Sequence, residues 1–131
     1  MLAISRPETP QYETRNRESS KGKREQVIRL ARQFIQKYPD NKLAYNSKYL
    51  LAEIIYQKGQ QAEALKLFNQ VIDAKNSMAP FAMYMKAKLL ANRGEKQAAL
   101  KQLNVLVNYY TSSNVIPKAE RLINKLGGQN E

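Results

Sequence analysis

The chain has 131 residues, with 22 lysines and arginines against 11 aspartates and glutamates, a formal net charge of +11, and neither cysteine nor histidine. These absences exclude disulfides, thiolate or imidazole metal ligands, and the Ser-His or Cys-His pairs of many hydrolases. We therefore expect no catalytic residue, no metal and no cofactor. A chain rich in alanine, leucine, lysine and glutamine, with only five glycines and five prolines, favours an all-α fold.

The first 20 residues carry two prolines and many polar side chains without apolar periodicity. Such a segment buries too little apolar surface to offset its ordering entropy, so we predict a flexible arm over residues 1–20. Residues 1–5 are too short for the apolar core of a secretory leader, and no apolar run of about 18 residues occurs. We expect no membrane span and, for the chain as written, a cytoplasmic address, or a periplasmic one if a leader was removed.

Apolar residues recur at helical spacing through the rest of the chain. The first helix is expected to begin at a cap formed by Ser19 or Ser20. Gly59 is expected to end the second, because glycine adopts the left-handed conformation without a Cβ clash. We assign one domain to residues 21–128 and a tail to residues 129–131. Six antiparallel helices joined by short loops are predicted, at about residues 21–38, 43–58, 61–74, 80–92, 96–110 and 117–126.

Six residues of one predicted hairpin have counterparts 35 positions later. Tyr49, Ala52, Gly59, Ala64, Leu65 and Phe68 recur as Tyr84, Ala87, Gly94, Ala99, Leu100 and Leu103. Because a helical unit of this length cannot bury its apolar face alone, neighbouring units must stack into a curved array. The alanines are expected where the helices of a hairpin cross, since a larger side chain there would separate the backbones at a cost of about 1 to 3 kcal/mol.

Residues 45–76 and 80–111 resemble the tetratricopeptide repeat, in which a leucine and a small residue in the first helix are followed by an alanine and an aromatic residue in the second. The matching residues are Leu51, Ala52, Ile55, Ala64 and Phe68 in the first unit, and Ala87, Leu90, Gly94, Ala99 and Leu103 in the second. The family's tryptophan and closing proline are replaced by Lys48 and Asn76, and in the second unit Lys86 stands where the leucine of the first helix would be. The resemblance implies a right-handed α-solenoid of two hairpins with a flanking helix at each end.

Residues 24–126 are also similar to the C-terminal domain of the Tol-Pal-associated periplasmic cell-division coordinators and to the repeats of outer-membrane assembly lipoproteins. These proteins are bacterial envelope adaptors. The similarity therefore implies that the chain acts by binding other proteins.

In arrays that this chain resembles, the first helix of each hairpin usually lines the concave side. The helical period places an aromatic strip there that passes into a basic end. A second interpretation stays open, in which the aromatic side chains pack between hairpins and the basic ones form a solvated face. The residues predicted to bind a partner are Asn46, Tyr49, Glu53, Tyr56, Phe81, Tyr84, Lys88, Lys118, Arg121 and Lys125.

The leading functional hypothesis is a non-catalytic adaptor or scaffold that binds another protein or an extended, acidic peptide on the concave face. The charge of +11 leaves a basic helical nucleic-acid-binding domain open, because polyanions gain affinity through counterion release. The spread of basic residues over every predicted helix does not favour that alternative. A third hypothesis is a self-assembling scaffold or regulatory subunit, in which apolar ends of the array pair with copies of themselves.

Overall fold

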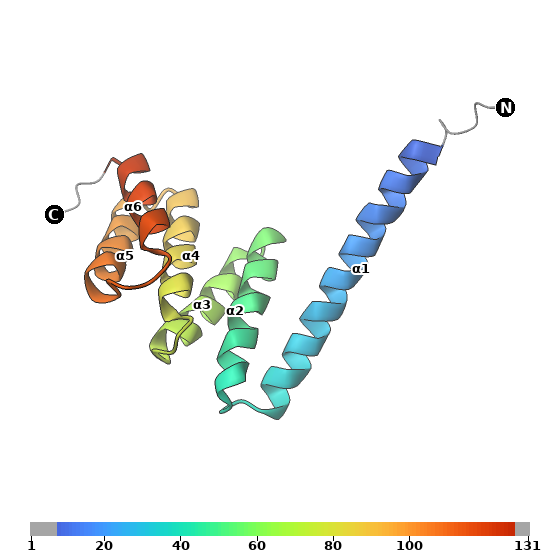
Figure 1. Cartoon of the computed structure of the whole chain (residues 1–131), viewed down its shortest axis with the longest axis horizontal. Helices are drawn as coiled ribbons and strands as arrows, with labels where there is room; N and C mark the ends of the chain where they lie inside the picture. The colour runs from blue at the N-terminus through green and yellow to red at the C-terminus, as the bar shows by residue number, and fades with distance from the viewer. Residues whose placement is uncertain (1–7, 128–131) are drawn as a thin grey trace.

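The computed structural model describes the backbone of residues 8–127 and the side chains of residues 20–127. The described part is built from helices alone, which confirms the predicted all-α class (Figure 1). None of these helices has the length and apolar character needed to cross a membrane. They are α1 (Glu8–Lys37), α2 (Lys42–Gln57), α3 (Gln61–Asp73), α4 (Ala79–Asn92), α5 (Lys96–Tyr109) and α6 (Ile116–Lys125).

Helix α1 departs from the prediction, because it begins at Glu8 and not after Ser19 or Ser20. The structure places residues 8–20 of the predicted flexible arm in a helix, which corrects that part of the prediction, while residues 1–7 lie outside the described chain. Pro10 falls in the first turn, where a backbone N–H has no helical partner to lose, and no proline follows it before the helix ends. The apolar period marks the part of a helix that packs, so it overlooked a polar extension that projects from the other helices (Figure 1).

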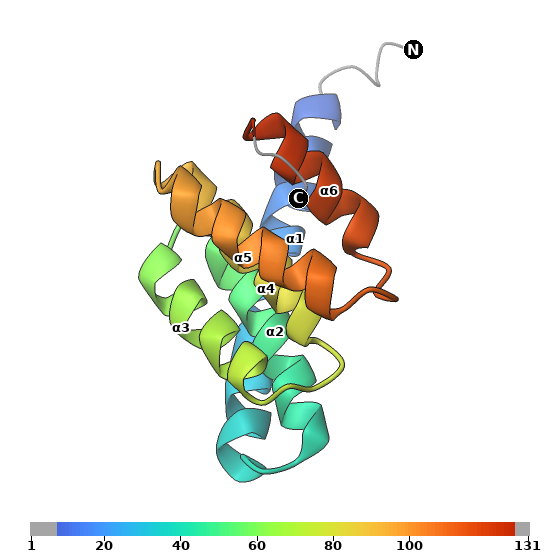
Figure 2. The ribbon, with the colours of Figure 1, turned by 90° about the vertical axis from the view of Figure 1, so that its left-hand side faces the viewer.

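Each helix packs against its neighbour in the chain. The α2–α3 and α4–α5 hairpins are joined by the packing of α3 on α4, with α1 against α2 and α6 against α5. Figures 1 and 2 show α1 and α6 at opposite ends of this array. The arrangement is the predicted one of two hairpins between flanking helices.

Two apolar clusters form the core, one centred on the α2–α3 hairpin and the other on α4, α5 and α6. Phe68 and Leu103, which occupy equivalent positions in the repeat, are fully buried in the first and second cluster, respectively. The four alanines predicted at helix crossings also expose no surface. These alanines are Ala52, Ala64, Ala87 and Ala99.

The two hairpins turn in the same way at glycines that lie 35 residues apart. Gly59 has φ +85° and Gly94 has φ +82°, a left-handed conformation that favours glycine. The Gly59 N–H donates to the Tyr56 carbonyl, and the next N–H reaches back to the Ile55 carbonyl. Gly94 and the residue after it form the same pair of bonds at the end of α4. This pair of hydrogen bonds satisfies carbonyls that the helix end would otherwise leave free, and it confirms the predicted cap at Gly59.

Candidate functional site

A groove of about 420 Å³ is lined by residues from α2, from α4 and from the start and first turns of α6. We call it the α2/α4/α6 groove. Its lining includes eight of the ten residues predicted to bind a partner, namely Tyr49, Glu53, Tyr56, Phe81, Tyr84, Lys88, Lys118 and Arg121. The structure therefore brings most of the predicted set together, and it leaves their role in binding to experiment.

Helical geometry explains why these side chains meet. Tyr49, Glu53 and Tyr56 are spaced four and three residues apart on α2, so they form one stripe. The residues contributed by α4 follow the same rule, with spacings of three and four. Proline lies in the first turn of both α4 and α6, where its fixed φ suits a helix start. The prolines therefore mark where α4 and α6 begin, and the helical spacing that follows sets which residues share a face.

Two predicted residues lie outside the lining. Asn46 is half-buried, one turn before Tyr49 on α2, and Lys125 is exposed at the last turn of α6. Three further residues line the groove that the sequence did not single out, namely Gln57, Met85 and Val115. The first two follow Glu53 and Phe81 by one helical turn, so the same period could have found them. Val115 precedes α6 and carries no periodic signal.

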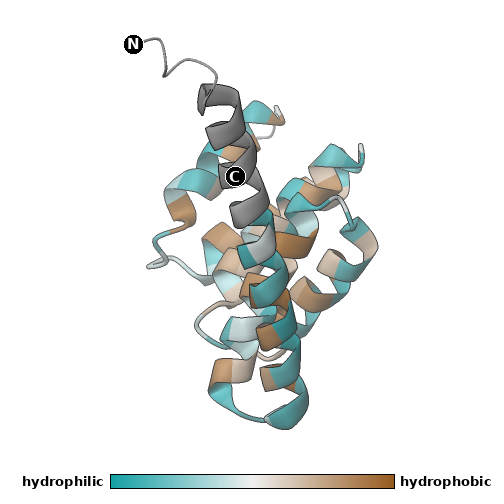
Figure 3. Ribbon diagram, turned by 90° about the vertical axis from the view of Figure 1, so that its right-hand side faces the viewer, coloured by the Kyte–Doolittle hydropathy of each residue, from teal (hydrophilic) through white to brown (hydrophobic). Residues whose placement is uncertain are grey.

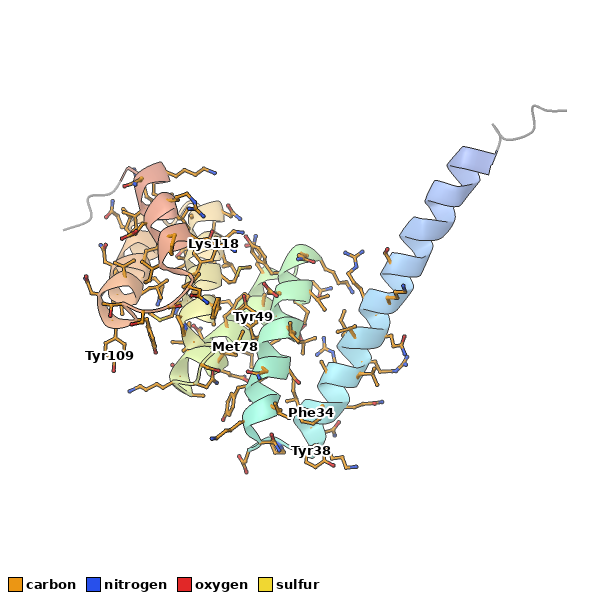
Figure 4. The ribbon with its side chains drawn as sticks, in the orientation of Figure 1. Phe34, Tyr38, Tyr49, Met78, Tyr109 and Lys118 are labelled. Carbon is orange, nitrogen blue, oxygen red and sulfur yellow. The ribbon has the colours of Figure 1, made fainter. Side chains whose placement is uncertain are left out.

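Tyr49 is both a core residue and a groove residue. Only 8% of its surface is exposed, and its ring centroid lies 6.0 Å from that of Phe68 and 6.5 Å from that of Phe81. Its hydroxyl donates a 3.0 Å hydrogen bond to Glu53 Oε2. The ring thus packs between the two hairpins, as the second interpretation expected, and the polar end of the residue faces Glu53. Figure 4 labels Tyr49 on the side of α2 that faces the rest of the array.

Burial, and then the neighbouring Glu53 carboxylate, raises the pKa of Tyr49 well above its ordinary value. The folded state therefore holds this proton more tightly than the unfolded chain does. Stability from this group is present in full below pH about 10 and is lost as the pH rises above that value. We expect urea midpoints of the wild type to fall more steeply between pH 9 and 11 than those of Tyr49→Phe. Parallel declines would contradict the assignment.

The lining of the groove carries three basic side chains and one carboxylate, a net charge of +2 (three minus one). Lys88 Nζ lies 5.7 Å from the centre of the Tyr84 ring, within the range of a cation–π contact. Lys118 and Arg121 are exposed on α6. Glu53, at the α2 side, is engaged by the Tyr49 hydroxyl. The groove is therefore aromatic near α2 and basic near α6.

A polar contact joins the walls of the groove, since Asn92 Nδ2 of α4 donates to the Tyr56 hydroxyl of α2. Among the side chains of residues 20–127, no group of three or more carboxylates comes together in a way that could hold a metal ion. What the groove offers is cations, aromatic surface and hydrogen-bonding groups. These are means of non-covalent recognition.

Comparison with known proteins agrees with the fold of stacked helical hairpins. The family model of the tetratricopeptide repeat-like domain matches residues 7–110. The chain belongs to this family, whose repeat fold is typical of non-catalytic domains that bind other proteins. The match includes all of α1, so the polar extension lies within the family's unit. No significant match is found among curated proteins.

Proposed function

We propose that the protein is an adaptor that binds an extended segment of a partner protein in the α2/α4/α6 groove. The observation that carries the proposal is the joint lining of one groove by three helices that are distant in sequence. Tyrosine and phenylalanine offer large contact area at low entropic cost, and such residues are enriched in binding sites. A groove of about 420 Å³ suits a few side chains of an extended chain.

Charge selects the kind of segment. The lining has a net charge of +2, and its exposed basic side chains, Lys118 and Arg121, lie on α6. An acidic segment would complement that end, whereas a basic one would be repelled. Lysine and arginine bind carboxylates by charge-assisted hydrogen bonds. We therefore propose an acidic peptide segment with its carboxylates near Lys118 and Arg121.

Charge reversal at Lys88 and Arg121 is expected to weaken binding without changing the fold. The probe is a fluorescein-labelled peptide of alternating glutamate and aromatic residues, followed by fluorescence anisotropy. The double variant Lys88→Glu/Arg121→Glu should bind about tenfold more weakly or worse. Lys66→Glu is the matched control, because Lys66 is an exposed lysine on α3 that does not line the groove. Unchanged affinity in the double variant, with a native helical spectrum, would refute the groove as the binding site.

The net charge of +11 supports a second candidate, a basic domain that binds nucleic acid. Such binding weakens steeply with salt, because phosphate contacts release counterions. Titration with a random duplex and with a random single strand at 50 and 200 mM salt separates the two functions. Tight binding with a steep salt slope would favour the nucleic-acid candidate over the adaptor.

The resemblance to bacterial envelope adaptors gives a narrower version of the proposal. It rests on the repeat pattern of residues 24–126, and it implies a partner protein of the bacterial envelope. Crosslinking in the native organism, followed by mass spectrometry, would identify the partner. Recovery of cytoplasmic proteins alone would contradict the envelope assignment and leave the adaptor proposal standing.

A further inference from the structure

The large apolar side chains that remain exposed are concentrated at one end of the array. Among residues 20–127, seven are exposed, and five of these lie on α1, on α2 or in the connection between them. The five are Val27, Leu30, Tyr38, Leu43 and Leu50, and the other two, Val105 and Tyr109, lie on α5. A cluster of this kind marks an interaction surface more often than scattered apolar residues do.

The exposed residues of α1 lie beside its core side. Ile28 is buried and packs in the core with Ile35, and Arg32 bonds Glu63 of α3 at 2.9 Å. Val27 and Leu30 are therefore turned away from α3, since successive residues are rotated by about 100°. The half-buried Phe34 continues this stripe one turn after Leu30.

The exposed residues of α2 join the same surface. Leu43 and Leu50 are two turns apart on α2, and 58% and 53% of their surfaces are exposed. They are separate from Leu51, which is in the core, and from the residues that line the groove. Figure 4 shows Phe34 beside α2 and Tyr38 close to the α1–α2 connection. We call this surface the N-terminal apolar face; it comprises Val27, Leu30, Phe34, Tyr38, Leu43 and Leu50.

The opposite end of the array has a different surface. The exposed residues of α6 are a proline and polar or charged residues, namely Pro117, Lys118, Glu120, Arg121, Asn124 and Lys125. Repeat arrays need a polar outer face on their terminal helix to stay soluble. Helix α6 meets that requirement, whereas α1 presents apolar residues at the other end. Figure 3 shows the molecule from the side of α1, coloured by hydropathy. The N-terminal apolar face therefore lacks the polar covering that the other end has.

We propose that the N-terminal apolar face binds an amphipathic helix of another protein, whose apolar stripe is flanked by acidic residues. The spacing of Val27, Leu30 and Phe34 at three and four residues is the one by which helices pack on each other. Exposed lysines border the face at Lys23 and Lys37 on α1 and at Lys42 on α2. The connection between these helices carries one exposed acidic residue, Asp40. Acidic flanks complement these lysines, whereas a second copy would bring the same lysines face to face.

The test uses two synthetic 18-residue helical peptides with the same leucine stripe, one flanked by glutamates and the other by lysines. Each is titrated into the full chain by calorimetry. The glutamate peptide should bind saturably and the lysine peptide about tenfold more weakly or worse. Leu30→Glu and Leu50→Glu should each weaken binding of the glutamate peptide about tenfold or more. Val105→Glu is the matched control, because Val105 is 48% exposed on α5, and it should bind normally.

Three results would overturn the proposal. The first is failure of the glutamate peptide to bind. The second is self-association of the chain in sedimentation that Leu30→Glu abolishes, because a second copy would then cover the face. The third is binding to phosphatidylserine vesicles through these leucines with no binding of the peptide. The Lys88→Glu/Arg121→Glu variant should bind the helical peptide normally, so failure of this proposal is separable from failure of the groove.

Discussion

Replacing Phe68 by alanine is expected to lower the free energy of unfolding by about 3 to 5 kcal/mol. The side chain exposes no surface, and it packs in the α2–α3 cluster against the ring of Tyr49. The truncation removes apolar contacts and leaves a cavity that helices fixed at both ends can close only in part. Urea unfolding followed by helical circular dichroism measures the loss. A shift this large would remove much of the stability of a domain of this size.

Tyr109→Ala is the control for this experiment. Tyr109 is an aromatic residue on α5 with 70% of its surface exposed, so its truncation should change stability by less than about 0.5 kcal/mol. If Phe68→Ala and Tyr109→Ala gave similar losses, Phe68 could not be the centre of the first cluster. The slope of the unfolding curve should stay the same, because both variants expose a similar surface on unfolding.

Tryptophan at Ala64 or Ala99 is expected to lower the melting temperature by about 10 °C or more. Neither alanine exposes any surface, and they occupy equivalent positions in α3 and α5. An indole at either position must push a helix of the hairpin away from its partner, because the site has no room to spare. Thermal unfolding followed by circular dichroism gives the measurement.

Each tryptophan variant has a neighbouring control on the same helix. Ala62 and Ala98 are exposed, so Ala62→Trp and Ala98→Trp add the same side chain on the solvent side. These variants should melt within about 2 °C of the wild type. Melting temperatures that fell equally in control and test variants would show that the tryptophan acts through helix propensity and not through the hairpin crossing.

Helices α2 to α6 could be predicted to within about two residues, because their ends are set by local chemistry. Gly59 and Gly94 end two of them, and proline lies in the first turn of α4 and α6. The start of α1 could not be predicted in this way. Its first half has no apolar stripe, and it mixes good helix formers such as glutamate and arginine with poorer ones such as threonine, asparagine and serine. The pattern therefore gave no sign of a helix there.

The residues that each helix contributes to the groove could be predicted from the periodicity within that helix. The period on α2 grouped Tyr49 with Tyr56, and the period on α4 grouped Phe81 with Tyr84. The sequence left open whether Tyr49 binds a partner or packs between hairpins, because its burial depends on contact with the Phe81 ring of the next hairpin. The periodicity within one helix does not show which side chains from a helix about 30 residues further along the chain pack against it.

The matching turns after α2 and α4 make the chain modular. Residues 60–94 begin directly after one turn and end with the glycine of the other. If this segment were duplicated in tandem, each copy would be joined to the next by the same turn. That turn has the two backbone hydrogen bonds donated by the glycine, Gly59 or Gly94, and by the residue after it. Whole segments of this kind could therefore be added or removed while the turn between neighbouring segments stays the same. Each added segment would lengthen the array by another pair of helices.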